Sequence, residues 1–479
     1  MHFDWFEFNV GGFFVSFSHF VQQWRGRQDD LAVVCDDKTF SYAELAETVD
    51  SWSAYLQQKG LQPGDCVAMA GTISIDMIAL VIALVQHACI VVPFLSANDV
   101  DRGEALEAAC VDYLIEFDAA GEAQFSACGH GRAHPLLDQL RGDVPEAGLI
   151  LFTSGSTGKN KASVHRFSRL ISNVTRKDRR SFRALIFLMF DHIGGMNTLL
   201  HTLCHGGTAV FVPDRSVDTV CRAIEQHKVE LLPTTPTFLN MVLISELYRQ
   251  YDLSSLRMVT YGTEPMLPAT LSALNIALPN VRCKQTYGLT EAGILPTQSE
   301  GQGSLFMKVG GENYETKVVD GILHIRSDSA MLGYLNAPSP FCEEGWLNTG
   351  DRVEMRDGFM RILGRDSEII NVGGEKVYPT EIENIILGVS NIGDVVVSGK
   401  KSAVTGQLVI ATVLLKSPEE AAAVERRVRR HCQQHLPAFK VPAAIKVTYE
   451  TMHSSRFKKM RKRSGTAAAA APAAEANVA

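Results

Sequence analysis

Close cysteine pairs are missing from this sequence. Its 10 cysteines are scattered along the chain, and none forms a Cys-x-x-Cys pair or joins nearby histidines at the spacing of a zinc site. We therefore expect reduced thiols in a cytoplasmic protein, and neither a disulfide framework nor a structural zinc site.

Uninterrupted hydrophobic runs are also scarce. The most apolar stretch, residues 78–95, is broken by Gln86, His87 and Pro93, so a buried helix followed by a buried strand explains it better than a membrane span. The N-terminal segment, residues 1–17, lacks the basic region and the small-residue cleavage site of a signal peptide. These features predict neither export nor a membrane span.

An excess of positive charge is absent as well. Lys and Arg total 46 against 53 for Asp and Glu, and the resulting net charge of −7 gives no general attraction to nucleic acid. With 46% hydrophobic and 21% charged residues, the composition is that of an ordinary globular protein.

The pattern of apolar segments predicts an α/β fold. Short apolar runs alternate with longer helical stretches such as residues 42–59 and 75–86, which is typical of α/β layers with largely parallel strands. The apolar runs lie at residues 32–35, 66–70, 90–94, 113–117, 149–152 and 209–212.

The length of 479 residues suggests roughly two to four domains. Residues 301–364 carry short strands separated by Gly and Asp turns, which predicts a small β-rich lobe. We place the domain boundary at residues 365–368. The predicted parts are a large N-terminal domain, a small α+β C-terminal domain and a flexible Ala-rich tail, at residues 1–365, 366–463 and 464–479.

The most informative segment, residues 149–164, is an apolar strand followed by small and hydroxyl residues. Small residues let the backbone curl around an anion, backbone N–H groups and hydroxyls can donate to phosphate oxygens, and lysine adds charge. This predicted phosphate loop contains Thr153, Ser154, Gly155, Ser156, Thr157, Gly158 and Lys161. The spacing between Gly155 and Gly158 is too short for a Walker A loop, which excludes a P-loop NTPase.

Three further motifs follow in a fixed order: Tyr287-Gly288-Leu289-Thr290-Glu291, then Asn348-Thr349-Gly350-Asp351, then residues 364–383. Together with the phosphate loop they resemble the adenylate-forming superfamily, which includes acyl-CoA and aryl-CoA ligases, adenylation domains of peptide synthetases and luciferases. The resemblance extends from about Ser41 to Arg463. It implies an enzyme that uses ATP and Mg²⁺ to convert a carboxylic acid into acyl-AMP and then transfers the acyl group to a thiol, in two orientations of a mobile C-terminal domain.

The resemblance also implies roles for the nucleotide-binding residues. The phosphate loop contacts the β- and γ-phosphates, Thr290 contacts the α-phosphate, and Glu291 holds Mg²⁺. Asp351 matches the ribose ligand, and Arg365 matches an arginine near the hinge. The other implied nucleotide contacts are Gly262, Thr263, Glu264, Tyr287 and Gly288. A local alternative makes Thr290 a helix N-cap and Glu291 a first-turn carboxylate.

In the C-terminal domain the resemblance implies a hinge and a thiol channel. Glu368 occupies the hinge position, where the family usually has Asp. Gly373 and Gly374 match the loop that lets the pantetheine arm of the acceptor pass close to the backbone, and His192 is the second residue implied to border this channel.

A basic segment closes the recognisable sequence. Lys458 matches the family lysine that binds the substrate carboxylate and the α-phosphate, with Phe457 in place of the usual glycine, and Lys459 is the alternative. Because 6 of the 8 residues from 456 to 463 are basic, a solvated tail or a local nucleic-acid patch is the competing interpretation. We favour the catalytic one, and the implied catalytic residues are Lys458, Lys161, Thr290 and Glu291.

The acyl pocket is the least defined part of the prediction. Asp191 and His192 border it, but His192 could instead be a hydrogen-bonded core histidine. Adjacent residues of a strand face opposite sides, so we place His192 at the pocket and expect Asp191 to point away. An Asp191 inside the pocket would require an amino group on the acid or a basic residue beside it. The other predicted pocket residues are Gly262, Tyr287, Gly288 and Leu289.

These inferences leave three functions in order of preference. The first is an AMP-forming ligase that joins an aryl or acyl acid to CoA. The second is an adenylation enzyme that loads an aryl or amino acid onto the phosphopantetheine of a carrier protein. The third is a non-catalytic nucleotide-binding relative, to which the departures at Asn160, Glu368 and Phe457 give limited support. The partners expected are a carboxylic acid and CoA or a carrier protein, with no nucleic acid.

Overall fold

The chain divides into two compact units. A computed structural model describes residues 9–10, 13–14, 17–95, 102–154, 160–175, 180–311, 313–454 and 456–461. The first unit contains the described residues up to Ser367 together with residues 456–458, and the second contains residues 368–454 and 459–461. Residues 456–458 thus group with the first unit, although the sequence places them within the C-terminal domain.

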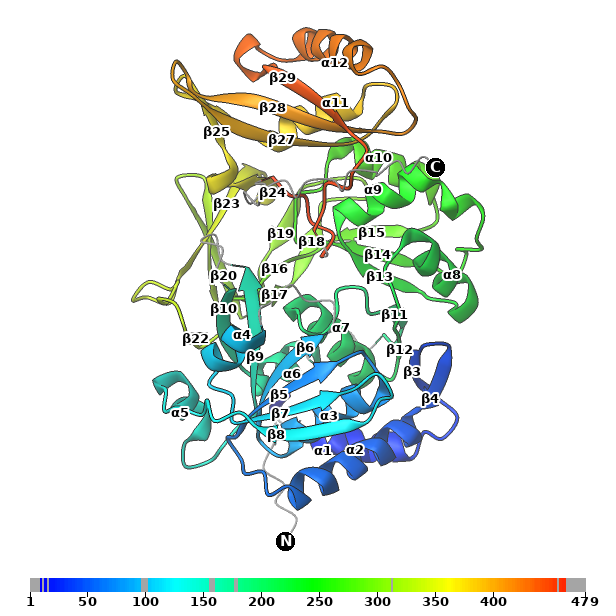
Figure 1. The fold of residues 1–479 in the computed structure, drawn as a ribbon, viewed down its shortest axis with the longest axis vertical. Coiled ribbons are helices and arrows are strands. Elements are labelled where there is room, and N and C mark those ends of the chain that lie inside the picture. Colours follow the sequence, from blue (N-terminus) through cyan, green and yellow to red (C-terminus); the bar gives the residue numbers. More distant parts are fainter. Residues whose placement is uncertain are drawn as a thin grey trace, which may run out of the picture. The chain divides into compact units, whose positions relative to one another are not determined.

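One sheet of the first unit has seven strands in the order β22-β10-β9-β6-β5-β7-β8 (Figure 1). The pairs β9–β6, β6–β5 and β5–β7 are parallel, whereas the pairs β22–β10, β10–β9 and β7–β8 are antiparallel. The strands are β22 (Gly333–Tyr334), β10 (Asn160–Arg166), β9 (Gly148–Ser154), β6 (Ile90–Leu95), β5 (Cys66–Gly71), β7 (Tyr113–Phe117) and β8 (Ala123–Ala127).

A second seven-stranded sheet has the order β15-β14-β13-β11-β12-β3-β4 and is parallel except for the β3–β4 pair. The strands are β15 (Arg282–Gln285), β14 (Met258–Tyr261), β13 (Leu231–Thr234), β11 (Arg183–Leu185), β12 (Thr208–Val210), β3 (Leu31–Cys35) and β4 (Lys38–Ser41). Together the two sheets confirm the predicted α/β layers.

The predicted β-rich lobe is a six-stranded sheet in the order β18-β19-β24-β23-β21-β20. Its turn at Asp320 and Gly321 has φ values of 50° and 77°, the left-handed region that two-residue hairpins require. The strands are β18 (Thr297–Ser299), β19 (Met307–Val309), β24 (Phe359–Arg365), β23 (Leu347–Arg356), β21 (Ile322–Ser327) and β20 (Tyr314–Val319). Two short hairpins, β1 (Asn9–Val10) with β2 (Phe13–Phe14) and β16 (Tyr287–Leu289) with β17 (Gly293–Leu295), are separate from it.

Side-chain caps begin several helices of the first unit. Ser41 and Glu44 form a capping box at α2, and Ser74 and Ser216 accept hydrogen bonds at the starts of α3 and α8. The helices are α1 (Phe17–Arg25), α2 (Tyr42–Gln58), α3 (Ile75–Gln86), α4 (Arg102–Ala108), α5 (Pro135–Arg141), α6 (Phe167–Thr175), α7 (Ile193–Cys204), α8 (Val217–His227), α9 (Pro236–Ser245) and α10 (Pro268–Ala277), with the short 3₁₀ helix η1 (Leu247–Arg249). A second 3₁₀ helix, η2 (Asp366–Glu368), spans the boundary between the two units.

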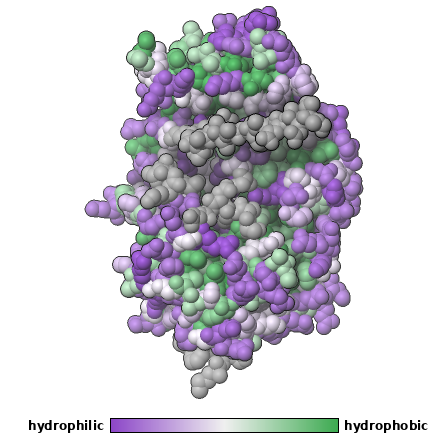
Figure 2. Space-filling model, in the orientation of Figure 1, coloured by the Kyte–Doolittle hydropathy of each residue, from purple (hydrophilic) through white to green (hydrophobic). Residues whose placement is uncertain are grey.

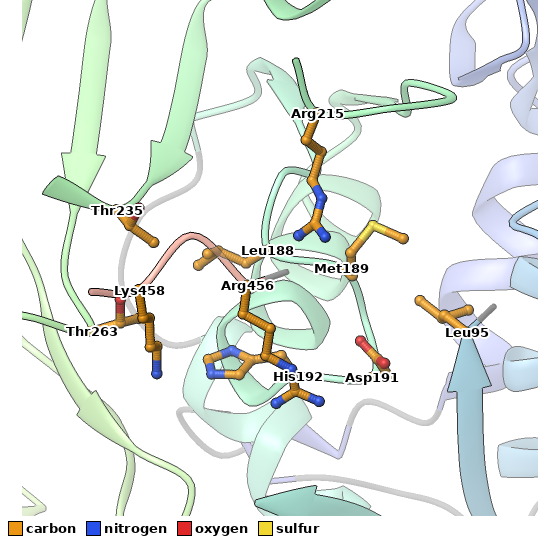
Figure 3. Close-up of a pocket in the computed structure, with 10 residues that line it drawn as sticks. All are labelled: Leu95, Leu188, Met189, Asp191, His192, Arg215, Thr235, Thr263, Arg456 and Lys458. Atoms are coloured by element: carbon orange, nitrogen blue, oxygen red, sulfur yellow. The ribbon is translucent and has the colours of Figure 1, made fainter. Parts of the chain in front are cut away.

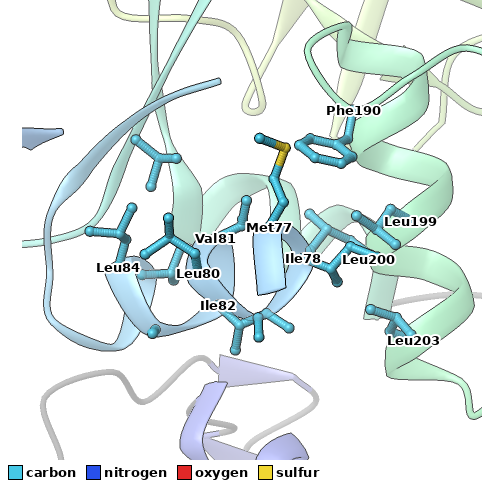
Figure 4. Close-up of a cluster of buried hydrophobic side chains, with 14 of the residues drawn as sticks. Met77, Ile78, Leu80, Val81, Ile82, Leu84, Phe190, Leu199, Leu200 and Leu203 are labelled. Atoms are coloured by element: carbon cyan, nitrogen blue, oxygen red, sulfur yellow. The ribbon is translucent and has the colours of Figure 1, made fainter. Parts of the chain in front are cut away.

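Helix α3 explains the most apolar stretch of the sequence. Every residue from Met77 to Val85 is buried, so this helix has apolar residues on all its faces. Its side chains meet those of α7 and Phe190, which lies just before α7 (Figure 4). A Cβ atom at Gly195 would lie 1.7 Å from the carbonyl oxygen of Met189, so only glycine lets α7 pack this closely. This packing fixes the turn at residues 190–192 against the core.

The second unit is a five-stranded sheet covered by two helices. The strand order is β26-β25-β28-β27, and β29 pairs with β28. Its elements are β25 (Ile370–Val372), β26 (Glu375–Val377), α11 (Pro379–Leu387), β27 (Ile392–Ser402), β28 (Gly406–Leu415), α12 (Ala421–His435), η3 (Ala438–Lys440) and β29 (Ala444–Thr448). Side chains from α11, α12 and the sheet share one apolar core, as an α+β domain requires.

The described helices contain none that is both long and apolar enough to cross a membrane. On the face drawn in Figure 2, hydrophilic residues predominate and apolar residues form small patches. All 10 cysteines are free thiols, and most are buried. Burial raises the pKa of these buried thiols, for example that of Cys283 to about 11, which keeps them protonated and unreactive.

Candidate active site

A small cavity lies within the first unit (Figure 3). Its volume is about 20 Å³, which is room for roughly one water molecule. The residues that line it are Leu95, Leu188, Met189, Asp191, His192, Arg215, Thr235, Thr263, Arg456 and Lys458.

The topology brings these residues together from separate parts of the chain. Thr235 follows β13, Thr263 follows the neighbouring strand β14, and residues 188–192 follow β11 on the other side of β13. The carboxyl ends of neighbouring parallel strands share one edge of a sheet, which is where α/β folds place their ligand sites. The cavity is therefore at the position that the fold class predicts for a binding site.

Asp191 and His192 both line the cavity, which corrects the expectation that Asp191 points away. That expectation assumed a strand, but residues 190–192 form a turn just before α7. Alternation of side chains applies to extended strands only, and a turn can direct two consecutive side chains to the same side.

His192 is neutral in this site. Its Nδ1 accepts a hydrogen bond of 3.1 Å from the backbone N–H of Gly194 and so caps α7. Burial lowers the pKa of His192 to about 3, and the positive charges of Lys458 and Arg456 act in the same direction. Because Nδ1 accepts, the single ring proton lies on Nε2, which is a hydrogen-bond donor.

Arg215 is the basic residue that Asp191 requires. Asp191 is only 6% exposed, so its negative charge needs a nearby cation. Burial lowers the pKa of Arg215, whereas the charge of Asp191 raises it. The need for a basic residue beside a buried Asp191 could be inferred from the sequence. Nothing in the local sequence indicated that Arg215, in a loop before α8, is that residue.

Phe457 anchors the segment that carries Lys458. The ring centroid of Phe457 lies 5.2 Å from that of Phe187 and 5.5 Å from that of Phe238, and the guanidinium of Arg215 is 5.2 Å from the ring. The Thr235 hydroxyl donates a 2.8 Å hydrogen bond to the Phe457 carbonyl. The backbone φ of Phe457 is 53°, a conformation that favours glycine, so aromatic packing offsets a local cost here.

Lys458 reaches the cavity and Lys459 does not. Burial lowers the pKa of Lys458, Glu264 opposes this, and the charges of Arg456 and Arg365 add to it. The Nζ atom of Lys459 instead lies in the second unit, 3.0 Å from Asp394 Oδ1 and 2.8 Å from the carbonyl oxygen of Val395.

The basic segment is also less available to nucleic acid than its composition suggests. Arg461 forms ion pairs with Glu383 and with Glu368 inside the second unit, and Lys459 is buried there too. Of this segment, residues 462–463 lie outside the described part of the chain. The described basic residues thus have structural roles or line the cavity.

The ribose-binding prediction concerns a buried carboxylate. Asp351 is 7% exposed and accepts a 2.5 Å hydrogen bond from the Tyr287 hydroxyl, and Arg365 Nε lies 3.3 Å from its other oxygen. Burial and the charge of Asp351 raise the pKa of Tyr287, so this tyrosine remains a donor. Tyr287 and Arg365 thus fix the orientation of Asp351.

Glu291 lies in a hairpin turn. Thr290 and Glu291 stand between β16 and β17, which rules out the alternative in which they begin a helix. The Tyr334 hydroxyl donates a hydrogen bond to Glu291 Oε1, and the Lys161 ammonium lies 4.9 Å from the centre of the Tyr334 ring. Tyr334, in the two-residue strand β22, belongs to none of the motifs and could not be identified from the sequence.

The phosphate loop lies only partly within the described residues. Thr153 and Lys161 are paired across the antiparallel strands β9 and β10. Gly155, Ser156, Thr157 and Gly158, and the side chain of Ser154, lie outside the described part of the chain. The two ends of the phosphate loop therefore lie next to each other. Lys161 and Glu291 both contact Tyr334, which places them on the same tyrosine.

The remaining predicted pocket residues do not reach the cavity. Among the described residues that line it, Gly262, Tyr287, Gly288 and Leu289 are absent. Gly262 has a packing reason, since a Cβ there would lie 2.7 Å from Thr286 Oγ1. Gly288 is similar, because a Cβ there would lie 2.9 Å from the carbonyl oxygen of Gly293.

The residues predicted for the hinge and the thiol channel in the C-terminal domain have local structural explanations in the second unit. Arg461 Nε lies 3.1 Å from Glu368 Oε2. Gly373 and Gly374 form the turn between β25 and β26 with φ values of 61° and 94°, which glycine adopts readily. Their functional roles stay predictions.

A magnesium ion would need ligands from the nucleotide. Within the described residues no group of three or more His, Cys, Asp or Glu side chains is arranged to hold a metal. Mg²⁺ is commonly held by one or two carboxylates together with substrate phosphates, and a single carboxylate at Glu291 fits that chemistry.

Comparisons with known proteins show similarity over most of the chain. Residues 20–335 match the family described as AMP-binding enzyme, and residues 381–459 match the AMP-binding enzyme C-terminal domain. The chain is 27% identical to indoleacetate–CoA ligase of Aromatoleum aromaticum, over 92% of this chain and 96% of that protein. It is also 27% identical to fatty acid–[acyl-carrier-protein] ligase ScoC of Streptomyces coeruleorubidus, over 86% of this chain and 88% of that protein.

Among solved structures, the anthranilate CoA ligase AuaEII in complex with anthranoyl-AMP is similar in fold. It superposes with a TM-score of 0.78 at 20% identity, and the match covers 95% of this chain and 96% of the other. At this identity the likeness establishes the fold alone.

Proposed function

This chain belongs to the AMP-binding enzyme family, and we propose that it activates an aryl or acyl carboxylic acid with ATP and then transfers the acyl group to the thiol of CoA. The observation that carries this proposal is the position of Lys458. Its side chain lines the cavity together with His192 and Thr263, and Glu264 and Glu291 are close enough to influence its pKa. One lysine thereby links the cavity to the residues proposed to hold ATP.

The proposed nucleotide contacts are built on two carboxylates, those of Asp351 and Glu291. The buried Asp351 carboxylate accepts from the ribose hydroxyls, and Tyr287 and Arg365 hold its oxygens in place. Glu291, oriented by Tyr334, is the residue that would hold Mg²⁺, which would supply charge neutralisation at the phosphates. Lys161 adds a positive charge near the same tyrosine.

The first half-reaction needs no nucleophile from the protein. An oxygen of the substrate carboxylate attacks the α-phosphorus, the bond to the pyrophosphate oxygen breaks, and pyrophosphate leaves with the electron pair. The Lys458 ammonium lies between two anions that would otherwise repel each other, so it favours their approach and stabilises the charge that develops. Burial strengthens this interaction because little water competes with it.

In the second half-reaction the sulfur of CoA attacks the acyl carbonyl carbon, the bond to the AMP oxygen breaks, and the thiol proton passes to solvent. His192 contributes a neutral Nε2–H donor at the cavity, and its lowered pKa keeps it from competing with Lys458 as a cation. The hinge at Glu368 and the thiol channel at His192, Gly373 and Gly374 belong to this half of the proposal.

ATP–pyrophosphate exchange with a panel of carboxylic acids tests the proposal. We expect exchange that depends on the acid and on Mg²⁺, followed by release of AMP when CoA is added. Absence of exchange with every acid, while ATP still binds, would instead support a non-catalytic nucleotide-binding protein.

The resemblance to ScoC favours a second acceptor, the phosphopantetheine of a carrier protein. The same exchange assay, followed by parallel incubation with CoA and with a phosphopantetheinylated carrier protein, separates the two acceptors. Thioester formation on the carrier protein alone would replace CoA in the proposal and leave the adenylation step intact.

A further inference from the structure

The hairpin that carries Thr290 and Glu291 at its turn is a small element. Its strands β16 and β17 share three pairs of residues, and in the described part of the chain they form a two-stranded sheet separate from the larger ones. An isolated two-stranded hairpin is at best marginally stable in water. Contacts from outside the hairpin must therefore fix the position of Glu291.

The chain from the end of β21 to β22 supplies several of these contacts. The backbone N–H of Met331 donates a 2.9 Å hydrogen bond to the Glu291 carbonyl, and the Tyr334 hydroxyl donates to the Glu291 carboxylate. The Ser327 hydroxyl donates a 3.0 Å hydrogen bond to the carbonyl of Ala292, the residue that follows Glu291. This part of the chain therefore holds both the backbone and the carboxylate of the hairpin turn.

Ser329, in the same part of the chain, extends these contacts. It is 7% exposed, and its hydroxyl lies 3.0 Å from the Ser327 hydroxyl and 3.3 Å from the Ala292 carbonyl oxygen. The hydroxyl of Tyr314, a residue of β20, is 3.0 Å from the same Ser329 oxygen. Ser329 thus joins the hairpin to β20.

The chain of hydrogen bonds continues from β20 back to the hairpin. The Tyr314 hydroxyl donates a 2.8 Å hydrogen bond to Asn173 Oδ1, in α6, and Asn173 Nδ2 donates a 3.1 Å hydrogen bond to the Ile294 carbonyl, in β17. A hydroxyl has only one proton, so Tyr314, which donates it to Asn173, acts toward Ser329 as an acceptor. The donors therefore follow one direction, from Ser329 to the Ile294 carbonyl.

The network holds the hairpin on both sides of Gly293. The φ of Gly293 is 79°, and a Cβ at this position would lie 3.0 Å from Ser329 Oγ, so glycine allows the close approach of the serine. Ala292 and Ile294, whose carbonyls are held, flank this glycine and come soon after Glu291. In a buried network each hydrogen bond depends on its neighbours, so loss of the Ser329 hydroxyl should loosen the turn.

We propose, as an extension of the function proposed above, on which it rests, that Ser329 is a positioning residue for Glu291. Its network with Tyr314 holds the hairpin turn where the Glu291 carboxylate can bind Mg²⁺. Tyr334 orients the carboxylate itself, whereas the Ser329 network fixes the backbone from which that side chain extends. Because Mg²⁺ requires near-ideal coordination geometry, a small displacement of a ligand side chain weakens its binding.

A purely structural role is the competing explanation. In that case, loss of the Ser329 hydroxyl would lower the stability of the first unit without changing its interaction with Mg²⁺. Binding of ATP with and without the metal separates the two roles, and it requires no turnover.

Isothermal titration calorimetry of ATP binding, without an acid, provides the test. For the wild type and each variant, the Kd of ATP is measured in excess Mg²⁺ and in EDTA, and thermal unfolding shows whether the variant is folded. The variants are Ser329→Ala, Tyr314→Phe, Glu291→Gln and the double variant Glu291→Gln with Ser329→Ala. Ser255→Ala is the matched control, because the Ser255 hydroxyl also donates to a backbone carbonyl, that of Val229, at 2.9 Å.

We expect Mg²⁺ to strengthen ATP binding by the wild type. The ratio of the Kd in EDTA to the Kd in Mg²⁺ should fall by roughly 3- to 10-fold in Ser329→Ala, the range for loss of one hydrogen bond, and by less in Tyr314→Phe, which keeps the serine. Glu291→Gln should remove most of the effect of Mg²⁺, and adding Ser329→Ala to it should cause no further fall, because the serine acts through that carboxylate. Ser255→Ala should have the wild-type ratio.

Other outcomes overturn the inference in distinguishable ways. A wild-type ratio in a folded but destabilised Ser329→Ala would leave the serine with a structural role only. A further fall in the double variant would show that Ser329 acts on a group other than Glu291. If Ser329→Ala does not fold, Tyr314→Phe, which keeps the aromatic ring, decides between these outcomes in its place.

Failure of the proposed function gives a different result. An unchanged ratio in Glu291→Gln would refute the Mg²⁺ role proposed for Glu291, and this inference with it, while acid-dependent pyrophosphate exchange would still support the proposed reaction. No binding of ATP by the wild type would refute the proposed function as well.

Discussion

Two consecutive lysines have opposite surroundings in this protein. Lys458 groups with the first unit, where burial lowers its pKa and the cationic residues Arg456 and Arg365 lie nearby. Lys459 groups with the second unit, where Asp394 and Glu383 raise its pKa although burial alone would lower it. One residue along the chain thus separates a lysine whose pKa is lowered by burial among charges of both signs from one whose acidic neighbours raise its pKa.

The difference teaches how to distinguish a functional lysine from a structural one. A buried ammonium among carboxylates is satisfied by the protein itself and has little affinity left for a ligand. A buried ammonium whose pKa stays lowered although carboxylates lie nearby is stabilised further by an incoming anion, and this is the arrangement expected where a carboxylate and a phosphate must meet. This difference supports the prediction that Lys458 rather than Lys459 is the catalytic lysine.

The largest effect expected on this comparison comes from Lys458→Ala. Acid-dependent pyrophosphate exchange should fall by roughly 10³-fold, since the variant removes the charge at which both anions meet. Thioester formation from chemically prepared acyl-AMP should continue, because the carboxylate has then already been joined to the phosphate. Single-turnover assays of the two half-reactions make the measurement, and equal losses in both would contradict the assignment.

Lys459→Met should lower the stability of the protein and leave its exchange activity largely unchanged. The methionine keeps the length and apolar stem of the side chain but leaves the buried Glu383 and Asp394 with one positive charge fewer, which should cost about 3 kcal/mol of unfolding free energy. Denaturant unfolding measures this loss, and exchange activity should persist at temperatures where the variant is folded.

A matched control for Lys459→Met is Lys440→Met. Lys440 forms a 2.7 Å ion pair with the half-exposed Glu381 in the same unit, and such a pair should be worth under about 1 kcal/mol. Equal losses of unfolding free energy in the two variants would show that the buried ion pairs of Lys459 stabilise the protein no more than the partly exposed pair of Lys440 does.

Phe457 should matter through the position of Lys458. Phe457→Ala removes the ring that packs on Phe187 and Phe238, and kcat for adenylation should fall by roughly 30-fold, about 2 kcal/mol, with little change in the KM for ATP. Phe457→Gly distinguishes the effect of losing the ring from the effect of backbone strain, because glycine adopts the φ of 53° without strain. Wild-type kcat in the glycine variant would show that the ring does not position Lys458.

Much of the fold could be predicted because local pattern and tertiary structure agree. The apolar run at residues 113–117 and the helical stretch at residues 75–86 match β7 and α3 in their bounds. In both segments burial follows directly from the apolar composition. The β-rich lobe could also be predicted from the sequence, since its Asp-Gly turn has the left-handed backbone that this dipeptide favours.

Only part of the candidate site could be predicted from the sequence, because some of its residues come together only in the folded chain. Motifs identify residues whose neighbours in the sequence share their function, such as Thr290 with Glu291. Arg215 and Tyr334 instead reach their partners Asp191 and Glu291 through the fold, and nothing in their local sequence marks them. The prediction at Asp191 is wrong because residues 190–192 form a turn rather than a strand, and side chains alternate only along a strand.

The smallest effect expected is a shift in the alkaline limb of the pH profile, which compares the two lysines in the unaltered chain. Because burial lowers the pKa of Lys458, the rate of adenylation should begin to fall at a lower pH than an ordinary lysine would dictate, by about tenfold per pH unit once the proton is lost. Between its folded and unfolded pKa values, Lys458 binds fewer protons in the folded state, so stability does not fall with this loss.

Lys459 has the opposite sign. Its raised pKa means that its contribution to stability is complete below the unfolded pKa and is lost only as the pH rises through the higher folded value. The second unit should therefore remain folded across the range in which Lys458 loses its proton. Pyrophosphate exchange and circular dichroism measured over the same alkaline series test this order of events. In Lys458→Arg, whose guanidinium stays charged, whatever exchange remains should lack this limb, and a limb that persists there or coincides with unfolding would assign the titration to another group.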